Sequence, residues 1–468
     1  MTEAVDVVVV GAGPAGIAAS MRLHEAGLRV VVLDERAGPG GNVYAGSLTG
    51  PFSASPRLGR DYAMGARAAR DFASSGVPVR YGSSISRIDG EAISYLRDGA
   101  LARISARRLI LATGAIERPM AFPGWQLPGV MGAGAFQLLM KQSGVVPARD
   151  YVLCGTGPLV LLMACQLLAL GSRPAAILDT NATRSPARTA LAHLPAISRS
   201  TRSVAKGLGY MARIRQAGVP VIADVVGLAA IGSDTVETLH YTRRDGSSGT
   251  IAAGLVLCHE GVIPNTQLTL ALGCRHVWDA APSCMVPVTD EFGESSRKGT
   301  FVVGDAAGIL GAAAAPHSGT LAAARIADEL APGRARHESG AARAALAWEK
   351  AFRAFLDLAY RPGIALEAPI ADGTMICRCE EVTAGTLRQA VRDGAQGPAQ
   401  AKVFTRCGMG LCQGRMCGST VNRIIAEETR RSREDVGSYH VRFPLKPLSL
   451  MDLANGPHPE EVLHETSA

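Results

Sequence analysis

The stretch DVVVVGAGPAG, residues 6–16, determines the fold class of this chain. An apolar run of this length is typical of a buried strand, and closely spaced glycines after it predict a tight turn into a helix. A second apolar strand ends at Asp34 and Glu35. Such a turn holds a pyrophosphate at the helix N-terminus, and the acid accepts a hydrogen bond from a ribose. We predict a dinucleotide site with Asp34 as the ribose ligand and Glu35 as the alternative. The expected phosphate ligands are Gly11, Gly13, Pro14, Ala15 and Gly16.

Three later segments extend this site. GPGGN at residues 38–42 supplies a loop with Gly41 and Asn42 that can support the same phosphates. RRLILATGAIERP at residues 107–119 is a strand that runs into a turn, and GTFVVGDAAGI at residues 299–309 is a strand whose GD pair opens a small-residue helix. Asp305 there is expected to be a buried acid at a helix N-terminus, where the macrodipole favours its ionised form, or an ordinary N-cap. The ligands predicted from the last two segments are Thr113, Gly114, Gly304 and Asp305.

These last two segments resemble the sequence markers of the glutathione-reductase-like flavoproteins, which carry two dinucleotide-binding domains. In that superfamily the aspartate of the GD pair meets the ribityl and pyrophosphate region of the flavin. The resemblance therefore implies an α/β, Rossmann-type fold and FAD as the bound dinucleotide.

A second dinucleotide domain is inserted between those markers. DYVLCGTGPLV starts another strand, turn and helix, and the following strand ends at Asp179. Gly155 and Gly157 match the first two glycines of the motif, but Val160 stands where close packing of helix on strand requires glycine or alanine. Three roles stay open: a hydride-donor site for NAD(P)H, an adenine nucleotide without hydride chemistry, or a scaffold. No CxxC or CxxxxC pair lies near either motif, which disfavours disulfide reductase chemistry.

Composition and charge narrow the choice of partner and compartment. The chain has 468 residues, 47% of them hydrophobic, and a net charge of +7 from scattered basic residues without a basic block, so no nucleic-acid partner is expected. The N-terminal residues MTEAVDVVVV have no basic segment ahead of their short apolar run, so they do not resemble a secretory signal peptide. The uncharged stretch at 151–171 is split by glycines and a proline, which predicts a strand and a buried helix in place of a membrane span. We expect a cytoplasmic protein whose ten cysteines are reduced or bind metal.

Half of those cysteines lie near the C-terminus, in ICRCEEVT and in TRCGMGLCQGRMC, as Cys377-x-Cys379 and Cys412-x4-Cys417 with Cys407 in addition. Four converging thiolates repel one another unless a cation holds them. A CxC pair fits the usual zinc loops poorly and suits a [2Fe-2S] cluster better, with zinc or reduced thiols as alternatives. Neighbouring glycine N–H groups and arginines would favour the reduced cluster and raise its potential.

At these residues the chain resembles the BFD-like [2Fe-2S] domain. Its fusion behind a flavoprotein module resembles the α subunits of opine oxidases, D-hydroxyproline dehydrogenases and hydrogen cyanide synthase. The resemblance implies Cys377, Cys379, Cys412 and Cys417 as the cluster ligands, and a Cys407/Cys412 pairing is the competing assignment. The expected domains are an FAD-binding domain at 1–120 and 266–330, an inserted dinucleotide domain at 121–265, a helix and linker at 331–371, the cluster domain at 372–435 and an extended tail at 436–468.

The resemblance also implies a function. In that family the amine is oxidised in a β subunit similar to D-amino-acid and sarcosine oxidases, often with a small ferredoxin-like γ subunit, and FMN at a subunit contact is compatible with it. His259 and His317 read as isolated, non-catalytic residues. We expect an electron-transfer subunit. Any association with the inner membrane would be peripheral and would occur through its complex. An autonomous NAD(P)H-dependent reductase and a non-catalytic cluster-carrying subunit are the alternatives.

Overall fold

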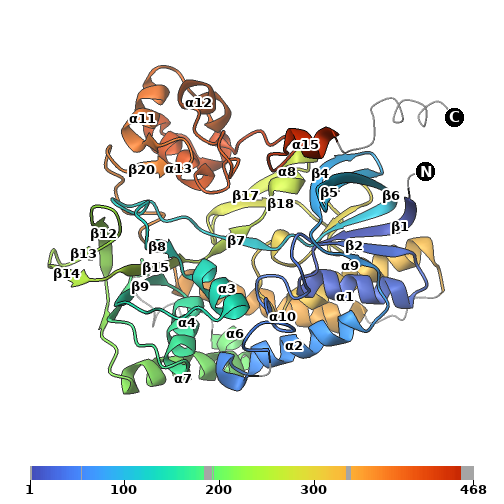
Figure 1. Cartoon of the computed structure of the whole chain (residues 1–468), viewed down its shortest axis with the longest axis horizontal. Coiled ribbons are helices and arrows are strands. Elements are labelled where there is room, and N and C mark those ends of the chain that lie inside the picture. The colour runs from blue at the N-terminus through green and yellow to red at the C-terminus, as the bar shows by residue number, and fades with distance from the viewer. Residues whose placement is uncertain (1–2, 54, 184–191, 193, 334–338, 455–468) are drawn as a thin grey trace.

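The structure, a computed structural model, describes residues 3–454 apart from 54, 184–191, 193 and 334–338. Figure 1 shows three parts: a first nucleotide domain that contains the blue N-terminal strands, a second one in teal and green, and a small helical domain in orange and red that stands above the second. The predicted combination of an α/β, Rossmann-type body with a small helical C-terminal domain is confirmed.

The first domain is built on the sheet that the N-terminal stretch predicts. Strands β2 and β6 pair with β1 in parallel, so that Val8 lies between Val31 and Leu109. Helices α1 and α9 pack together on one face of this sheet around a core of small aliphatic side chains, and β4 and β5 extend it as an antiparallel edge. The elements are β1 (Glu3–Val10), α1 (Pro14–Glu25), β2 (Val30–Leu33), α2 (Arg60–Ala73), β3 (Val79–Arg80), β4 (Ser84–Asp89), β5 (Ala92–Arg97), β6 (Ala100–Leu111), β19 (Thr300–Val302) and α9 (Ala315–Leu330).

The second domain repeats the pattern with a sheet of parallel strands in the order β11-β10-β9-β15-β8. Val152 of β9 lies between Ala176 and Val256 at its centre. The uncharged stretch at 151–171 forms β9 and α4, as predicted. The elements are β8 (Val130–Gly132), α3 (Ala133–Ser143), β9 (Tyr151–Thr156), α4 (Pro158–Ala169), β10 (Ala176–Asp179), α6 (Leu194–Arg199), α7 (Thr201–Gln216), β11 (Val221–Ile222), β12 (Val225–Ile231), β13 (Thr238–Arg243), β14 (Ser248–Ala252) and β15 (Leu255–Glu260).

Among the helices that the structure describes, none combines the length and apolar character that crossing a bilayer requires.

The chain passes between the two nucleotide domains along one antiparallel pair, β7 (Ala115–Glu117) on the way out and β16 (Val262–Pro264) on the return. It then forms α8 (Gln267–Ala271) and the hairpin of β17 (His276–Asp279) and β18 (Cys284–Pro287) before it re-enters the first sheet at β19.

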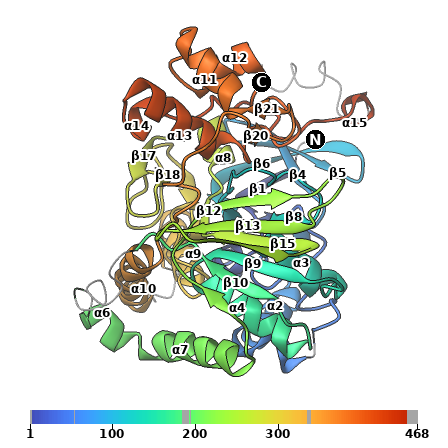
Figure 2. The ribbon, with the colours of Figure 1, turned by 90° about the vertical axis from the view of Figure 1, so that its left-hand side faces the viewer.

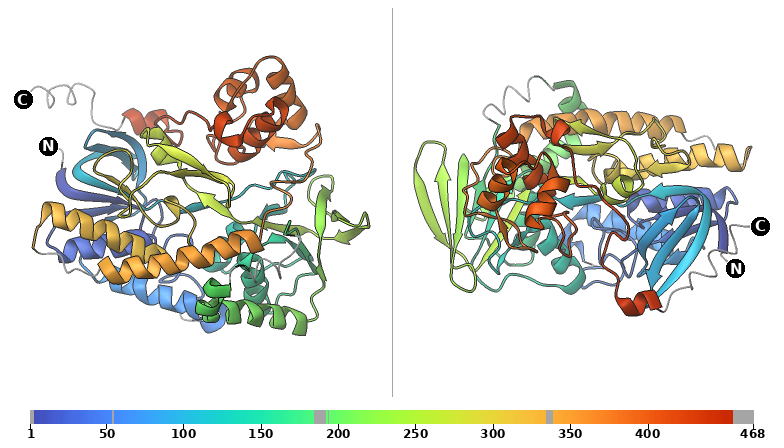
Figure 3. Two further views of the ribbon diagram at one scale, coloured as in Figure 1. Left: turned by 180° about the vertical axis from the view of Figure 1, so that it is seen from behind. Right: turned by 90° about the horizontal axis from the view of Figure 1, so that it is seen from above.

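Helix α10 (Ser339–Ala359) packs against α9 and α6 and, in the view from behind in Figure 3, runs from the first domain toward the second. After α10 the chain leads into the cluster domain, which has its own buried core. Trp125 donates a hydrogen bond from Nε1 to the Met375 carbonyl at 2.5 Å and ties this domain to the second nucleotide domain. Its elements, at the top of Figure 2, are β20 (Met375–Cys377), β21 (Val382–Thr383), α11 (Ala384–Arg392), α12 (Pro398–Thr405), α13 (Gly418–Thr429) and α14 (Arg433–Val436), and α15 (Leu450–Ala454) follows in the tail.

Candidate cofactor sites

The phosphate-binding turn has no room for side chains. Gly11 adopts φ of +107°, and a Cβ there would lie 2.4 Å from the Ala112 carbonyl oxygen. A Cβ on Gly16 would lie 1.9 Å from the carbonyl oxygen of Gly11. Gly13 caps α1 with Pro14 as its first residue, so the free N–H groups of the helix face the end of the sheet. The turn thus forms the cradle for an anionic group that the sequence predicts.

The two acids after β2 face different surroundings. Asp34 is buried, and its carboxylate accepts hydrogen bonds from the Ala12 N–H at 2.5 Å and the Arg36 N–H at 2.7 Å. Burial raises the pKa of Asp34, and these two backbone bonds oppose the rise. Glu35 is held at the surface by Lys446 Nζ at 2.6 Å and Ser84 Oγ at 3.2 Å. Both carboxylates reach the cavity described below, and the ribose ligand remains a prediction.

Asp305 lies in a different local structure from the one expected. Gly304 and Asp305 belong to a single 3₁₀ turn, η2 (Gly304–Ala306), and α9 begins only at Ala315. The Asp305 carboxylate accepts hydrogen bonds from the N–H groups of Leu310 at 3.0 Å and Gly311 at 2.7 Å. The GD pair thus opens a short 3₁₀ turn of small residues in place of a longer helix, and Asp305 is half-buried where a buried acid was expected; this acid organises the loop that precedes α9.

One cavity of about 1370 Å³ gathers these groups. Ordinary ligand pockets have about 300–1,000 Å³, so this one has the size for an extended dinucleotide. The cavity continues past α3 to the turn after β9 and to α10. Gly16 does not line it, because this residue packs under the turn. The predicted residues that do line it are Gly11, Gly13, Pro14, Ala15, Asp34, Glu35, Gly41, Asn42, Thr113, Gly114, Gly304 and Asp305.

Sequence reasoning missed a hydrogen-bonded histidine–glutamate pair in the wall of this cavity. His259, at the end of β15, places Nδ1 2.6 Å from Glu117 Oε1, so the expectation that His259 is isolated was wrong. Glu117 also accepts from the Gly134 N–H at 3.0 Å, and a Cβ at Gly132 would lie 2.0 Å from its carboxylate. Because Glu117 ends β7, the pair fastens the crossing strand to the second domain. The sequence signal for this pair was limited to position: Glu117 ends β7, the strand that leaves the first domain, and His259 lies shortly before β16, the strand that returns to it.

Lys141 is a second group that the sequence did not reveal. It is buried in α3, donates from Nζ to the Val43 carbonyl at 2.8 Å and to Gln137 Oε1 at 2.9 Å, and lines the cavity. Burial lowers its pKa from 10.5 to about 7, and Arg36 contributes to this shift.

This shift predicts a pH-dependent stability. Between about pH 7 and 10.5 Lys141 is mostly neutral in the folded protein and charged in the unfolded chain, so the unfolded state holds more protons. The free energy of unfolding of the flavin-free protein should therefore rise with pH across this window, by up to about 1.4 kcal/mol per pH unit. Lys141→Met should remove this slope, whereas Lys298→Met at an exposed position should keep it. Denaturant titrations at several pH values measure it, and equal slopes in both variants would contradict it.

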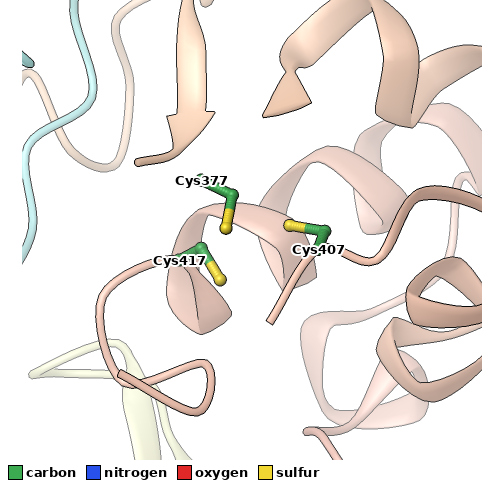
Figure 4. A group of neighbouring side chains, drawn as sticks. All are labelled: Cys377, Cys407 and Cys417. Carbon is green, nitrogen blue, oxygen red and sulfur yellow. The ribbon is translucent and has the colours of Figure 1, made fainter. Parts of the chain in front are cut away.

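The five C-terminal cysteines fall into two groups. Cys377, Cys407 and Cys417 are buried, and their sulfur atoms all lie within 4.8 Å of one another. Figure 4 shows the three thiols turned toward one point from different segments of the cluster domain. Cys379 is exposed and hydrogen-bonded to the backbone and thiol of half-buried Cys412.

The electrostatics of the buried group suit a cation. Hydrogen bonds from Cys407 and then Cys417 lower the pKa of Cys377 to about 2, and the Gly408 N–H supports the same thiolate. The shared bond with Cys377 raises the pKa of Cys407 to about 12. Cys377 is thus stabilised as a thiolate by hydrogen bonds from the thiol protons of Cys407 and Cys417. A metal centre takes the place of such protons, so these residues fit a thiolate-bound cluster.

The predicted ligand set is only partly brought together. Cys377 meets Cys417, and Cys379 meets Cys412, so each predicted loop gives one cysteine to each group. Cys407, predicted to be additional, joins the buried group. The glycines around it also have a packing role, because a Cβ at Gly408 or Gly414 would lie 2.7 Å from the ring of Tyr439. The choice of four ligands among five cysteines remains a proposal.

Comparisons with known proteins agree with this architecture. Residues 5–327 match the model of the pyridine nucleotide-disulphide oxidoreductase family, and residues 375–427 match that of the BFD-like [2Fe-2S] binding domain. The first of these models implies FAD, and the second, with the cysteine group, supports an iron–sulfur cluster.

The relatives described next align with this chain over nearly its whole length. The opine oxidase A subunit from Agrobacterium tumefaciens is 40% identical over 99% of this chain and 94% of its own length. The HcnB subunit of hydrogen cyanide synthase from Pseudomonas aeruginosa is 34% identical over 96% of this chain and 98% of its own length. The crystal structure of L-proline dehydrogenase from P. horikoshii has a TM-score of 0.68 and 20% identity over 97% of this chain and 80% of its own, which shows a shared fold. This chain belongs to the family of opine oxidase A subunits, which joins a pyridine nucleotide-disulphide oxidoreductase module to a BFD-like [2Fe-2S] domain.

Proposed function

We propose that this chain is the flavin- and iron–sulfur-containing electron-transfer subunit of a heteromeric dehydrogenase or oxidase. Its substrate would be an opine, D-hydroxyproline or a similar amino or imino acid, and a partner β subunit similar to D-amino-acid and sarcosine oxidases would oxidise the CH–NH bond. A small ferredoxin-like γ subunit and FMN at a subunit contact are compatible with this proposal. The relatives are each named as one subunit of an enzyme, which supports the existence of a partner subunit for this chain.

One observation carries this proposal: the cluster domain reaches the nucleotide cavity. Arg415 lies between Cys412 and Cys417, and it lines the same cavity as Gly11 and Asp305. Its Nη1 lies 3.4 Å from the Leu445 carbonyl, and Leu445 and Lys446 of the tail line the cavity too. The loop that carries the predicted cluster cysteines and the predicted nucleotide turn therefore border one cavity, which supports electron transfer between the two cofactors within one chain.

Each group of residues has a defined task in such a subunit. When bound, FAD accepts electrons in pairs and a [2Fe-2S] cluster passes them singly. The turn at Gly11 and the loop held by Asp305 would bind and orient the dinucleotide. The Glu117–His259 pair fixes the second domain against the crossing strand, and Arg415 brings positive charge to the side of the cluster that faces the cavity.

Expression of the chain with and without its partner tests the proposal. The chain purified alone should contain FAD and iron and should not oxidise opines or D-imino acids with an artificial acceptor. The complex purified from the native host should do so. Robust turnover by the single chain would contradict the proposal, and a chain with iron but no flavin would favour the non-catalytic cluster carrier.

A second candidate is an NAD(P)H-dependent reductase, which the glycines at 155 and 157 and the open cavity beside them favour. The chain itself, however, occupies the region beyond β10, where the adenosine of a nucleotide would lie. Asn181 Nδ2 donates to the Ala359 carbonyl at 2.8 Å, and the Ala182 N–H donates to the Arg361 carbonyl at 2.9 Å.

Buried Glu260 fastens the same segment. Its carboxylate accepts hydrogen bonds from the N–H groups of Ile364 at 2.8 Å and Ala365 at 2.6 Å, and from Thr180 Oγ1 at 2.5 Å. A Cβ at Gly363 would lie 2.2 Å from the Thr180 carbonyl oxygen, so the segment lies directly on the end of β10.

These contacts predict that NADH and NADPH do not reduce the protein rapidly. Anaerobic addition of either nucleotide should leave the flavin absorbance unchanged over minutes, while dithionite should bleach it. Val160→Gly should behave in the same way, because the segment after α10 remains in place. Fast bleaching of the wild-type flavin by either nucleotide would show that the second site is functional.

A further inference from the structure

The last turn of α12 and the cysteine loop that follows it present apolar side chains to solvent. Val403 and Phe404 of the helix are 77% and 54% exposed, Leu411 of the loop is 76% exposed, and two methionines of the loop are also exposed. Large contiguous apolar patches are rare on the surface of monomeric proteins and mark interaction sites. We call this set the cluster-loop patch: Val403, Phe404, Met409, Leu411 and Met416.

The patch belongs to a rigid scaffold. Gln413 donates from Nε2 to the carbonyls of Met409 at 2.9 Å and Gly410 at 3.0 Å, and the backbone closes tight turns at 409, 413 and 415. The ring of Tyr439 fills the space next to Gly408 and Gly414 beneath the loop. Met409, Leu411 and Met416 are thus displayed by a loop fixed from within, and Val403 and Phe404 by the last turn of α12, so docking there orders little chain and loses little conformational entropy.

The patch lies at the accessible side of the predicted cluster. A Cβ at Gly410 would lie 2.2 Å from the Cβ of Cys379, so Met409 and Leu411 flank this exposed cysteine. Cys379 is the exposed member of the five C-terminal cysteines, whereas Cys377, Cys407 and Cys417 are buried, so the predicted cluster is most accessible from outside the chain at this face.

The charges around the patch select its partner. Arg406 is mostly exposed and pairs with Glu380 at 2.9 Å. Lys402 Nζ lies 5.1 Å from the ring centre of Tyr439, and the guanidinium of Arg378 lies 5.2 Å from that of Trp125. These three cations outnumber the two carboxylates beside them, Glu380 and Glu381, so a complementary surface is acidic at its rim and apolar at its centre.

From these observations we infer that the cluster-loop patch is the docking surface for the amine-oxidising partner subunit, which covers the exposed edge of the cluster with an apolar centre and an acidic rim. Contacts with a transient electron carrier are small, whereas permanent interfaces are larger and more apolar. The apolar patch therefore favours a permanent subunit. This inference rests on the proposed function and adds the face of the chain at which that function is assembled.

Variants of the full complex test the inference. Leu411→Glu and Val403→Glu place a carboxylate in the centre of the patch, and each should weaken assembly with the partner subunit about tenfold or more. The matched control is Leu208→Glu in α7, where the leucine is 60% exposed on the side of the molecule opposite α12 in Figure 1. Co-purification of the tagged chain with its partner from the native host, followed by size-exclusion chromatography, measures assembly.

Iron content and the visible spectrum of each isolated variant serve as the folding check, and should equal those of the wild type. Intact assembly of both patch variants would overturn the inference while leaving the proposed function in place, because the wild-type complex would still form. If the wild-type chain assembles with no amine-oxidising subunit, both fail. The wild-type chain could instead form a homodimer that Leu411→Glu dissociates. That result would assign the patch to a second copy of this chain and overturn the choice of partner.

Discussion

Replacement of Cys417 by alanine is expected to remove the iron–sulfur cluster and leave the flavin. Cys417 is buried at the start of α13, where its sulfur meets that of Cys377. Loss of one thiolate leaves the cluster short of a ligand. The loss of iron should be large, since even a change in the groups that orient a ligand costs about 10–100-fold in metal affinity. Iron content and visible absorbance per chain, with FAD content measured on the same sample, check this.

Cys407→Ala separates the two possible ligand sets. If Cys377, Cys379, Cys412 and Cys417 hold the cluster, this variant should keep its iron although Cys407 lies in the buried group. Cys165→Ala is the matched control, because this cysteine is also buried but lies in α4. Iron retained in Cys417→Ala and lost in Cys407→Ala would contradict the proposed set and support ligation by Cys407.

Gly16→Val is expected to weaken FAD binding by roughly 100-fold. A Cβ at this position would lie 1.9 Å from the Gly11 carbonyl oxygen, so α1 must move away from the turn that holds the pyrophosphate. Overpacking costs about 3 kcal/mol, which corresponds to roughly a 100-fold loss of affinity. Flavin content after reconstitution and equilibrium titration with FAD measure the effect.

Two controls keep this result interpretable. Gly38→Ala lies in the neighbouring glycine-rich loop, where a Cβ meets nothing within 4 Å, and should bind FAD normally. Iron bound to the cluster domain should be retained in Gly16→Val, because that domain has a separate core. Normal FAD affinity in Gly16→Val would show that the first turn does not hold the dinucleotide.

Local signals were sufficient to predict the fold. The strand at residues 6–10 and the glycines after it specify β1, the turn and α1, because each step depends on neighbours along the chain. The repeat of the pattern at β9 and α4 could be recognised in the same way. The predicted nucleotide residues line one cavity because parallel strands of one sheet end at the same edge.

Long-range contacts of single side chains could not be predicted. His259 meets Glu117 across 142 residues, and Asn181 meets Ala359 across 178. No local pattern encodes such pairs, which exist only once the domains are docked. The grouping of Cys407 with Cys377 has the same origin, because the turns of the loop over Tyr439 decide which thiols face inward.

The central claim is that one chain holds a flavin beside a [2Fe-2S] cluster, and metal analysis with EPR of anaerobically purified protein tests it most directly. The account predicts FAD, iron and inorganic sulfide in the same sample, with the iron and sulfide in equal amounts and a [2Fe-2S] EPR signal that appears on reduction. Zinc in place of iron, with no such signal from the reduced protein, would contradict it.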